Sequence, residues 1–306
     1  MAVLNPPRIL PGLGRTIINF LIDSRRSWTE DELIEVFKPP GLNDRSSAHQ
    51  GMTNTLLAFK AVGMLSLNEG GAIAVTDTVV NDGSPLTQTR FRRQLQKHVL
   101  DLGRDGDPWQ TNPGEAHTSG ARDLTRALSW FLAQDALGDP LSWTDNVQTL
   151  QSAQFQSQDN ETWAITNDTR WGALTRWAPA LGLASTSVVR GKGPVPLPVV
   201  AINDVLDELP AGQIPIGDFL SSLTTELPVL HGGLARSSLA AHLPKGDPDP
   251  GVAEHCVDSS VGQALRVLED RHRLSFDTLP DAEGVRLSRF DSNRVTHVTV
   301  HPGGLE

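Results

Sequence analysis

The sequence predicts a predominantly helical α+β fold in which three helices followed by a β-hairpin occur twice, around a helical middle region. Three observations support this prediction. Apolar residues recur at helical spacing in short segments, prolines and glycines end those segments, and short apolar runs flank turn residues after each series. The 306 residues are 38% hydrophobic and 20% charged, as in globular proteins with apolar cores. We therefore expect about two or three domains.

The first series of three helices and a hairpin is predicted over residues 11–80. Apolar residues at helical spacing predict a helix over about 12–24. Thr29 and Glu32 have the spacing of a capping box, which would start a second helix. Two prolines after Lys38 end this helix, because proline lacks the backbone donor and its ring clashes with the preceding turn.

The third helix of this series is predicted to start at Ser47, where Ser47 and Gln50 repeat the capping pattern. It runs to about Val62, with Gly63 as a left-handed C-cap. Two short strands then flank the turn Asn68-Glu69-Gly70-Gly71. Three short helices followed by a hairpin are typical of a winged helix-turn-helix domain, which we assign to residues 1–84.

Residues 199–306 repeat this order and predict a second, acidic winged-helix-like domain. The predicted helices and strands of this domain are Val199–Leu209, Pro215–Leu227, Ser259–Arg271, and then Leu274–Leu279, Val285–Phe290 and Val295–Val300. A loop rich in proline and glycine, residues 244–251, interrupts the series. The sequence thus predicts tandem winged helix-turn-helix domains.

Between the two series lie a basic connecting helix and linker, residues 85–119, and a helical domain, residues 120–198. In the second of these segments we expect helices and one short strand at Ala121–Leu137, Thr144–Phe155, Asp168–Leu181 and Ala184–Val189. This domain is either a small helical bundle or a third, degenerate winged helix. Five of the seven tryptophans lie in it, and we expect them in the core because each has a large apolar area to bury.

Charge is distributed unevenly along the chain. The formal net charge is −10, and residues 199–306 hold 8 basic against 16 acidic residues. The only concentrated basic patch lies in residues 85–104, where one acid, Asp101, accompanies Arg90, Arg92, Arg93, Lys97 and Arg104. Arg93 and Lys97 are four residues apart and share a predicted helix face. The patch is either a solvated helix face or a contact for nucleic acid or an acidic partner.

The third predicted helix carries the residue types of a DNA reader. In a DNA-binding winged helix this helix enters the major groove. Met52, Leu56 and Phe59 form its inward stripe, which leaves outward His49, Gln50, Thr53, Asn54 and Lys60. Glutamine and asparagine read adenine, while histidine, threonine and lysine contact phosphate or guanine. These five residues, with Arg90, Arg92, Arg93 and Lys97, are the predicted DNA-binding residues. Docking of a protein is the alternative role of this domain.

Several enzyme classes are excluded by the residues that the sequence lacks. Without tyrosine the chain cannot be a tyrosine recombinase or a tyrosine-using topoisomerase. No lysine follows an acidic residue at the spacing of the strict metal-nuclease motif, and no phosphate loop occurs. One cluster, residues 254–258, resembles a metal site, but adjacent residues seldom converge on one ion. We expect a non-enzymatic protein with no catalytic residues, metal or cofactor.

The sequence also predicts the compartment. No apolar run approaches the roughly 18 residues that a membrane span requires, so we expect no membrane contact. The first residues lack the order of a signal peptide. The single cysteine, Cys256, cannot form an internal disulfide, which fits a reducing compartment. We therefore expect a cytoplasmic protein.

Four phrases of the sequence resemble the DpdG proteins. They are Asn5-Pro6-Pro7, Leu10-Pro11-Gly12-Leu13-Gly14-Arg15, Lys38-Pro39-Pro40-Gly41-Leu42, and Asp168-Thr169-Arg170-Trp171 followed by Trp177 and Leu181-Gly182-Leu183. DpdG proteins occur in bacterial gene clusters that insert 7-deazaguanine derivatives into DNA and restrict DNA lacking them. The resemblance implies membership of a multi-component anti-phage system, and it offers no established active site to transfer.

Two functions follow as hypotheses. The first is a non-enzymatic DNA-binding or adaptor subunit, which contacts double-stranded DNA and other proteins of the same defence system, such as an ATPase or nuclease. The acidic last third would suit a basic protein partner. The alternative is a stand-alone winged-helix transcriptional regulator that uses the first domain.

Overall fold

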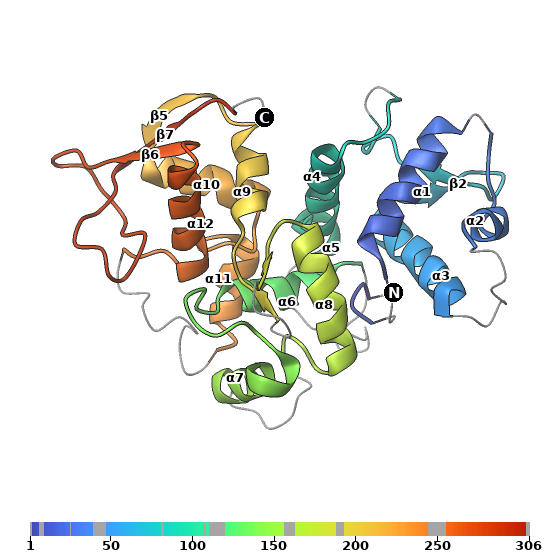
Figure 1. Ribbon diagram of the computed structural model, residues 1–306, viewed down its shortest axis with the longest axis horizontal. Helices are drawn as coiled ribbons and strands as arrows, with labels where there is room; N and C mark the ends of the chain where they lie inside the picture. Colours follow the sequence, from blue (N-terminus) through green and yellow to red (C-terminus); the bar gives the residue numbers. More distant parts are fainter. Residues whose placement is uncertain are drawn as a thin grey trace. The chain divides into compact units, whose positions relative to one another are not determined.

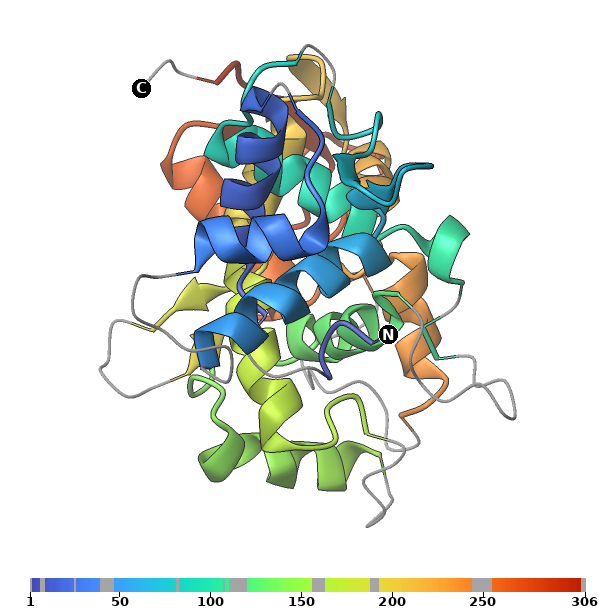
Figure 2. The ribbon, with the colours of Figure 1, turned by 90° about the vertical axis from the view of Figure 1, so that its right-hand side faces the viewer.

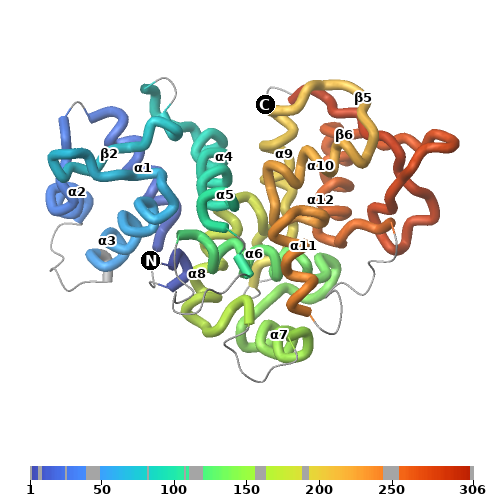
Figure 3. Tube along the Cα trace, turned by 180° about the vertical axis from the view of Figure 1, so that it is seen from behind, coloured from blue at the N-terminus to red at the C-terminus, as the bar shows by residue number. Residues whose placement is uncertain are grey.

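The computed structural model describes most of the chain. The described residues are 2–5, 9–24, 26–38, 47–80, 83–106, 108–109, 120–155, 163–187, 193–243 and 255–303, with only the backbone for 47 and 48. Two compact units contain them (Figures 1 and 3). The N-terminal unit comprises Met1–Gly106, Gln110–Leu124 and Asn167–Ala180. The C-terminal unit comprises Asp107–Trp109, Thr125–Thr166 and Leu181–Glu306.

Some predicted features lie outside the described residues. They are the double proline after Lys38, the side chain of Ser47, most of the linker 105–119, the end of the strand predicted to reach Val189, the loop 244–251 and Glu254. The predicted division at residues 84, 119 and 198 stays a prediction, because the two units are grouped by spatial contact and each combines separate stretches of sequence.

The N-terminal unit contains the first predicted series. Its helices and strands are α1 (Pro11–Asp23), α2 (Glu30–Phe37), α3 (Ser47–Ala61), β1 (Leu65–Leu67), β2 (Ile73–Val75), α4 (Gln88–Val99), α5 (Leu102–Asp105) and α8 (Asp168–Ala180). The predicted order of three helices and a hairpin is confirmed. β1 and β2 are antiparallel, with Leu65 opposite Val75. Trp28, between α1 and α2, forms an isolated antiparallel bridge with Ile73, so β2 lies between Trp28 and β1.

Local signals account for the ends of these helices. The Thr29 hydroxyl accepts the N–H of Glu32 at 3.3 Å, and the Glu32 carboxylate accepts the N–H of Thr29 at 2.8 Å, which confirms the predicted capping box. The hydrogen bonds that the Glu32 carboxylate accepts from the backbone N–H and the hydroxyl of Thr29 lower the pKa of Glu32. Gly63 adopts φ +76°, the left-handed conformation predicted for the end of α3.

The core of the N-terminal unit is centred on Phe59, which is fully buried. Its ring stacks on Phe91 of α4 and on Trp177 of α8, with ring centroids 6.1 Å apart in both pairs. Aromatic pairs at this spacing stabilise a core by about 0.5–1.5 kcal/mol beyond the burial of their area. Phe59 therefore joins α3 to two helices that are distant in sequence.

A buried carboxylate fastens the N-terminal residues to this unit. Asp123 accepts the backbone N–H groups of Val3 at 3.1 Å and Leu4 at 2.9 Å, and it also accepts the N–H of Leu124. Burial raises the pKa of Asp123 to about 6, although these hydrogen bonds and the charge of Arg170 act in the opposite direction. Asp123 thus places a carboxylate, which is costly to bury, against the backbone N–H groups of Val3 and Leu4, which would otherwise lack a partner.

The C-terminal unit contains the second series and most of the middle region. Its elements are η1 (Trp143–Val147), α7 (Gln148–Gln154), β3 (Ser185–Thr186), β4 (Pro194–Val195), α9 (Val199–Leu206), β5 (Gly212–Pro215), α10 (Ile216–Glu226), α11 (Leu234–Ala240), α12 (Ser259–Asp270), β6 (Leu274–Asp277) and β7 (His297–Val300). Helix α6 (Arg122–Leu132) contributes to this unit from Thr125 onward.

The sheet of the C-terminal unit has the order β5-β7-β6, with both pairs antiparallel. Thr299 of β7 lies opposite Gln213 on one side and Ser275 on the other. Since β5 follows the first helix of the series, α9, it corresponds to Trp28 in the N-terminal unit. Both units therefore place the segment after their first helix beside the last strand of the series.

Two expectations for the C-terminal unit were wrong, and one helix was not expected. The segment 285–290 is not a strand, because only Val285 bridges Val295 and Arg286 instead bridges Cys256. Strand β5 was not expected, because the sequence predicts a turn that ends at Gly212 and a helix that begins at Pro215. Helix α11 was not predicted, because its seven residues are too few to show a helical repeat.

The middle region also departs from expectation in detail. The helix predicted over 144–155 is a five-residue π-helical turn, η1, followed by α7. Four of its five tryptophans are buried, at 8% exposure or less: Trp130, Trp163, Trp171 and Trp177. Trp143, the first residue of η1, is only half-buried.

Asp123 gives stability a pH dependence that can be isolated by substitution. The folded state keeps the proton up to about pH 6, whereas an ordinary aspartate releases it near 3.8. The free energy of unfolding should therefore fall as pH rises from about 4 to 7, by up to about 3 kcal/mol relative to Asp123→Asn. Urea denaturation of both proteins across this range measures the difference. A difference that stays constant, or grows with pH, contradicts this assignment.

Candidate nucleic-acid interface

Helix α3 has the inward face that its sequence predicts. Leu56 and Phe59 are fully buried and Met52 is 4% exposed. Helix α3 contacts α1 and α2 in the N-terminal unit (Figure 2), and the Phe59 ring lies against Gly14 of α1. The orientation of α3 is fixed by this packing, so the positions of its remaining side chains follow from the helix geometry.

The outward face of α3 is polar and only partly exposed. Gln50 is exposed, while Thr53 and Asn54 are half-buried. These three residues are three and four positions apart, so they share one face of the helix. His49 is half-buried, and its carbonyl oxygen accepts the Thr53 hydroxyl at 3.2 Å. Amide side chains on such a face have the donor and acceptor pairs that base edges require.

Lys60 lies at the opposite end of α3 and is engaged within the unit. Its ammonium group donates to the Glu30 carboxylate of α2, with an N–O distance of 2.6 Å. Both side chains are only partly exposed, at 20% and 31%. An ammonium that already faces a carboxylate at this distance adds little net attraction for phosphate. The structure therefore brings Gln50, Thr53 and Asn54 together but leaves Lys60 apart from them.

The hairpin that follows α3 contributes no positive charge. The side chain of Asn68 accepts the N–H groups of Gly70 at 3.0 Å and Ala72 at 2.9 Å, which shapes the turn. The tip of the hairpin is exposed, but residues 64–76 contain no lysine or arginine. Their only charged residue is Glu69, which is acidic. The hairpin therefore offers no electrostatic attraction for phosphate.

The basic face of α4 differs from the predicted stripe. Arg93 is only 5% exposed, and its guanidinium donates to the Gln96 side chain at 2.7 Å. Arg93 therefore does not belong to an exposed stripe with Arg92 and Lys97, although Arg93 and Lys97 share a helix face as predicted. Helical spacing gave the angle between the two residues correctly, but Arg93 lies about 160° around α4 from the apolar stripe of Phe91, Leu95 and Val99. Its burial therefore comes from tertiary packing that the sequence of α4 does not show.

Arg90 and Lys97 form the exposed stripe of α4. Arg90 and Lys97 are both exposed, and they lie seven residues apart, close to two full helical turns. Arg92 is half-buried, nearer the apolar side. Arg104, counted in the same basic patch, binds the Asp105 carboxylate at 2.9 Å and the carbonyl oxygens of Val62 and His98. It therefore serves the packing of α5.

The two units differ strongly in charge. The N-terminal unit holds 15 basic and 14 acidic residues, a net charge of +1, whereas the C-terminal unit holds 11 and 22, a net charge of −11. Phosphate binding depends on lysine and arginine. The surface with α3 and the exposed stripe of α4 thus belongs to the unit whose charge least opposes nucleic acid.

The sequence cluster at 254–258 does not form a metal site in the part of the chain that is described. Among those residues, no group of three or more histidine, cysteine, aspartate or glutamate side chains could hold an ion. Cys256 is buried, with its thiol 3.5 Å from the Val257 carbonyl oxygen. Asp258 is bound by Arg236 and His231, each at 2.9 Å.

Sequence reasoning missed the pairing of Lys60 with Glu30 and the burial of Arg93. The first had a signal, since Glu30 belongs to the acidic first turn of α2 that packs on α3. The second had no signal that the sequence of a single helix can provide.

No helix of the described residues is long and apolar enough to cross a bilayer.

Comparisons with known proteins give one match. A family model described as DpdG-like matches residues 1–282. No curated protein and no solved structure matches the chain.

The burial of Arg93 predicts unequal costs for two neighbouring substitutions. Arg93→Ala should lower the free energy of unfolding by about 1–3 kcal/mol, because it leaves the buried Gln96 amide without this donor. Lys97→Ala should change it by less than about 0.5 kcal/mol, as exposed positions usually do. Urea denaturation measures both. Equal costs would show that Arg93 is solvated like Lys97.

Proposed function

Because this chain belongs to the DpdG-like family, we propose that it is a DNA-contacting adaptor subunit of a Dpd-type system, with catalysis left to other subunits. Membership of this family implies a role in a multi-component system. The observation that carries the DNA-contacting part is the outward face of α3, where Gln50, Thr53 and Asn54 lie together. The order of three helices and a β-hairpin around this helix supports the proposal that the segment is a winged helix-turn-helix domain.

The charges of the N-terminal unit determine how such a contact would work. In a helix-turn-helix the helix before the reader crosses the DNA backbone. In this chain that helix is α2, whose first turn is acidic, with Glu30, Asp31 and Glu32. These carboxylates oppose phosphate, so attraction to the backbone falls to the exposed stripe of α4, Arg90 and Lys97. We infer a modest, strongly salt-dependent affinity in which α3 supplies the base contacts.

Removing the amides of α3 tests base reading. Gln50→Ala and Asn54→Ala should each cost roughly 1–3 kcal/mol of discrimination between a selected duplex and a random one. The duplex is obtained by selection with the full chain, and binding is measured by fluorescence anisotropy. Gln213→Ala, an exposed glutamine of the C-terminal unit, is the matched control.

The same titration separates the alternatives. Undiminished discrimination in the Gln50→Ala/Asn54→Ala double variant would show that α3 is not the reader. Repeating the titration with a duplex whose guanines are replaced by a 7-deazaguanine derivative tests contact with guanine N7, which such bases lack. Recovery of one specific operator sequence, bound without other subunits, would favour the stand-alone transcriptional regulator.

Removing the two exposed cations of α4 tests backbone contact. The Arg90→Ala/Lys97→Ala double variant should reduce the slope of log affinity against log salt by about 2, close to one per lost phosphate contact. The control variant, Arg271→Ala/Arg294→Ala, removes two exposed arginines from the C-terminal unit. A slope unchanged by the first pair would show that the stripe is merely solvated. Equal reductions by both pairs would indicate net charge alone.

A further inference from the structure

Helix α12, which precedes the last two strands of the C-terminal unit as α3 precedes β1 and β2, is covered where α3 is open. Its first turns correspond to the part of a recognition helix that meets base edges. Here the Ser260 hydroxyl donates to the Leu132 carbonyl oxygen at 2.6 Å, and the Ser259 hydroxyl accepts the N–H of Ala136 at 2.8 Å. The end of α6 and the residues after it therefore occupy this side of α12.

A second segment closes the next turn of α12. The backbone of Leu287 lies so close to Gly262 that a Cβ atom there would overlap the Leu287 carbonyl oxygen. Glycine is required by this contact, since any side chain would push the segment 284–290 away. The first turns of α12 are thus packed against the chain itself on two sides.

The start of α12 is also anchored by a buried ion pair. Asp258, 1% exposed, precedes the helix and binds Arg236 of α11 through Nε at 2.9 Å and His231 through Nδ1 at 2.9 Å. Burial raises the pKa of Asp258, but the hydrogen bonds and charges of His231 and Arg236 outweigh it, so the pKa is lowered. Moving α12 outward would break this pair, which is costly for a buried charge.

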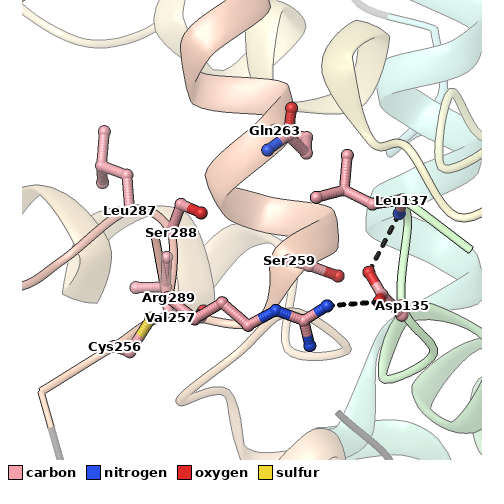
Figure 4. A pocket seen from close by; sticks show the side chains of 9 residues that line it. All are labelled: Asp135, Leu137, Cys256, Val257, Ser259, Gln263, Leu287, Ser288 and Arg289. Atoms are coloured by element: carbon pink, nitrogen blue, oxygen red, sulfur yellow. Dashed lines mark hydrogen bonds and ion pairs between the residues drawn. The ribbon is translucent and has the colours of Figure 1, made fainter. Parts of the chain in front are cut away.

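The two covering segments leave a pocket between them beside α12 (Figure 4). Its volume is about 280 Å³, including the open solvent at its mouth. It is lined by Asp135, Leu137, Cys256, Val257, Ser259, Gln263, Leu287, Ser288 and Arg289. Arg289 reaches across the pocket to Asp135, with a distance of 3.4 Å between Nη2 and Oδ2. Most of this volume is open solvent, and the enclosed part is about large enough for one water molecule, so the pocket is a shallow depression that takes only the end of a side chain at its mouth.

Exposed apolar side chains adjoin this pocket. Leu137, which lines it, is 52% exposed, and Phe290, the residue after Arg289, is 73% exposed. The Arg289 guanidinium carbon lies 5.0 Å from the centre of the Phe290 ring. Large apolar side chains exposed beside a pocket are typical of surfaces that bind proteins.

Charge selects the occupant of this surface. The C-terminal unit has a net charge of −11, which repels both phosphate backbones and a second copy of this chain, whose own charge is −10. A basic partner is attracted by the same charge. We propose that the pocket beside α12 binds an apolar side chain from a basic segment of another protein. This inference rests on the adaptor role proposed above, and its test requires no DNA.

Synthetic peptides test the proposal on the full-length chain. Eleven-residue peptides carry leucine, phenylalanine or serine at the centre, flanked on both sides by lysine or by glutamate, with binding followed by fluorescence anisotropy. The lysine-flanked leucine or phenylalanine peptide should bind at least about tenfold more tightly than its glutamate-flanked or serine-centred counterpart, since both the anchor and the charge are needed.

Variants locate the binding surface. Leu137→Ser and Phe290→Ser should each weaken binding of the best peptide at least about fivefold, because each removes exposed apolar area beside the pocket. Leu234→Ser, which removes an equally large side chain that is 74% exposed in the same unit, should leave it unchanged. Circular dichroism checks that the variants fold.

Three outcomes would overturn the proposal. Equal affinity for the lysine-flanked leucine and serine peptides would mean that charge alone binds them. Equal losses in all three variants would mean that the pocket is not the site. Concentration-dependent dimers in sedimentation, abolished by Phe290→Ser, would identify a second copy as the occupant.

Discussion

The burial of Phe59 is the packing interaction on which the candidate interface depends. Its ring lies against Phe91 and Trp177, so α3 is held from its inner side by α4 and α8. Because a helix has one orientation once its apolar stripe is fixed, this contact also sets the direction of Gln50 and Asn54. The aromatic core therefore positions the polar face, and a change at Trp177 would reach α3 without touching any polar residue of that face.

The two units use one arrangement of helices and strands in two ways. In both, the segment after the first helix pairs with the last strand of the series, as Trp28 does with Ile73 and β5 does with β7. Yet α3 keeps an accessible polar face, whereas α12 is covered near Gly262 by the chain's own backbone. The distribution of charge follows the same division, near neutrality in one unit and strong acidity in the other. Fold alone therefore does not decide which surface each unit leaves accessible.

Sequence reasoning succeeded where the physics is local. The Thr29 capping box and the apolar stripe of Met52, Leu56 and Phe59 depend on residues within a few positions of one another, and the structure has each of them. Strand β5 failed because its four residues, which include a glycine and a proline, are held by pairing with β7 far along the chain. The expected exposure of Arg93 was wrong for a similar reason, since packing against the rest of the unit decides which side chains of α4 are buried.

The candidate sites show the same limit. The residue types on the outward face of α3 were predictable from periodicity, and DNA contact by them stays a prediction. The pocket beside α12 had no signal in the sequence, because Leu137, Gln263 and Arg289 come from separate segments that only tertiary packing brings together.

The discontinuous make-up of the N-terminal unit affects its folding during synthesis. Helix α8 carries Trp177, so the ring that completes the environment of Phe59 is translated long after α1–α4. At roughly 5–20 residues per second, the ribosome needs about 6–24 s to pass from Phe59 to Trp177. Through that interval one side of the Phe59 ring lacks its partner, which exposes apolar surface to chaperones or to aggregation. Synonymous codons that slow translation before α8 would lengthen this vulnerable period.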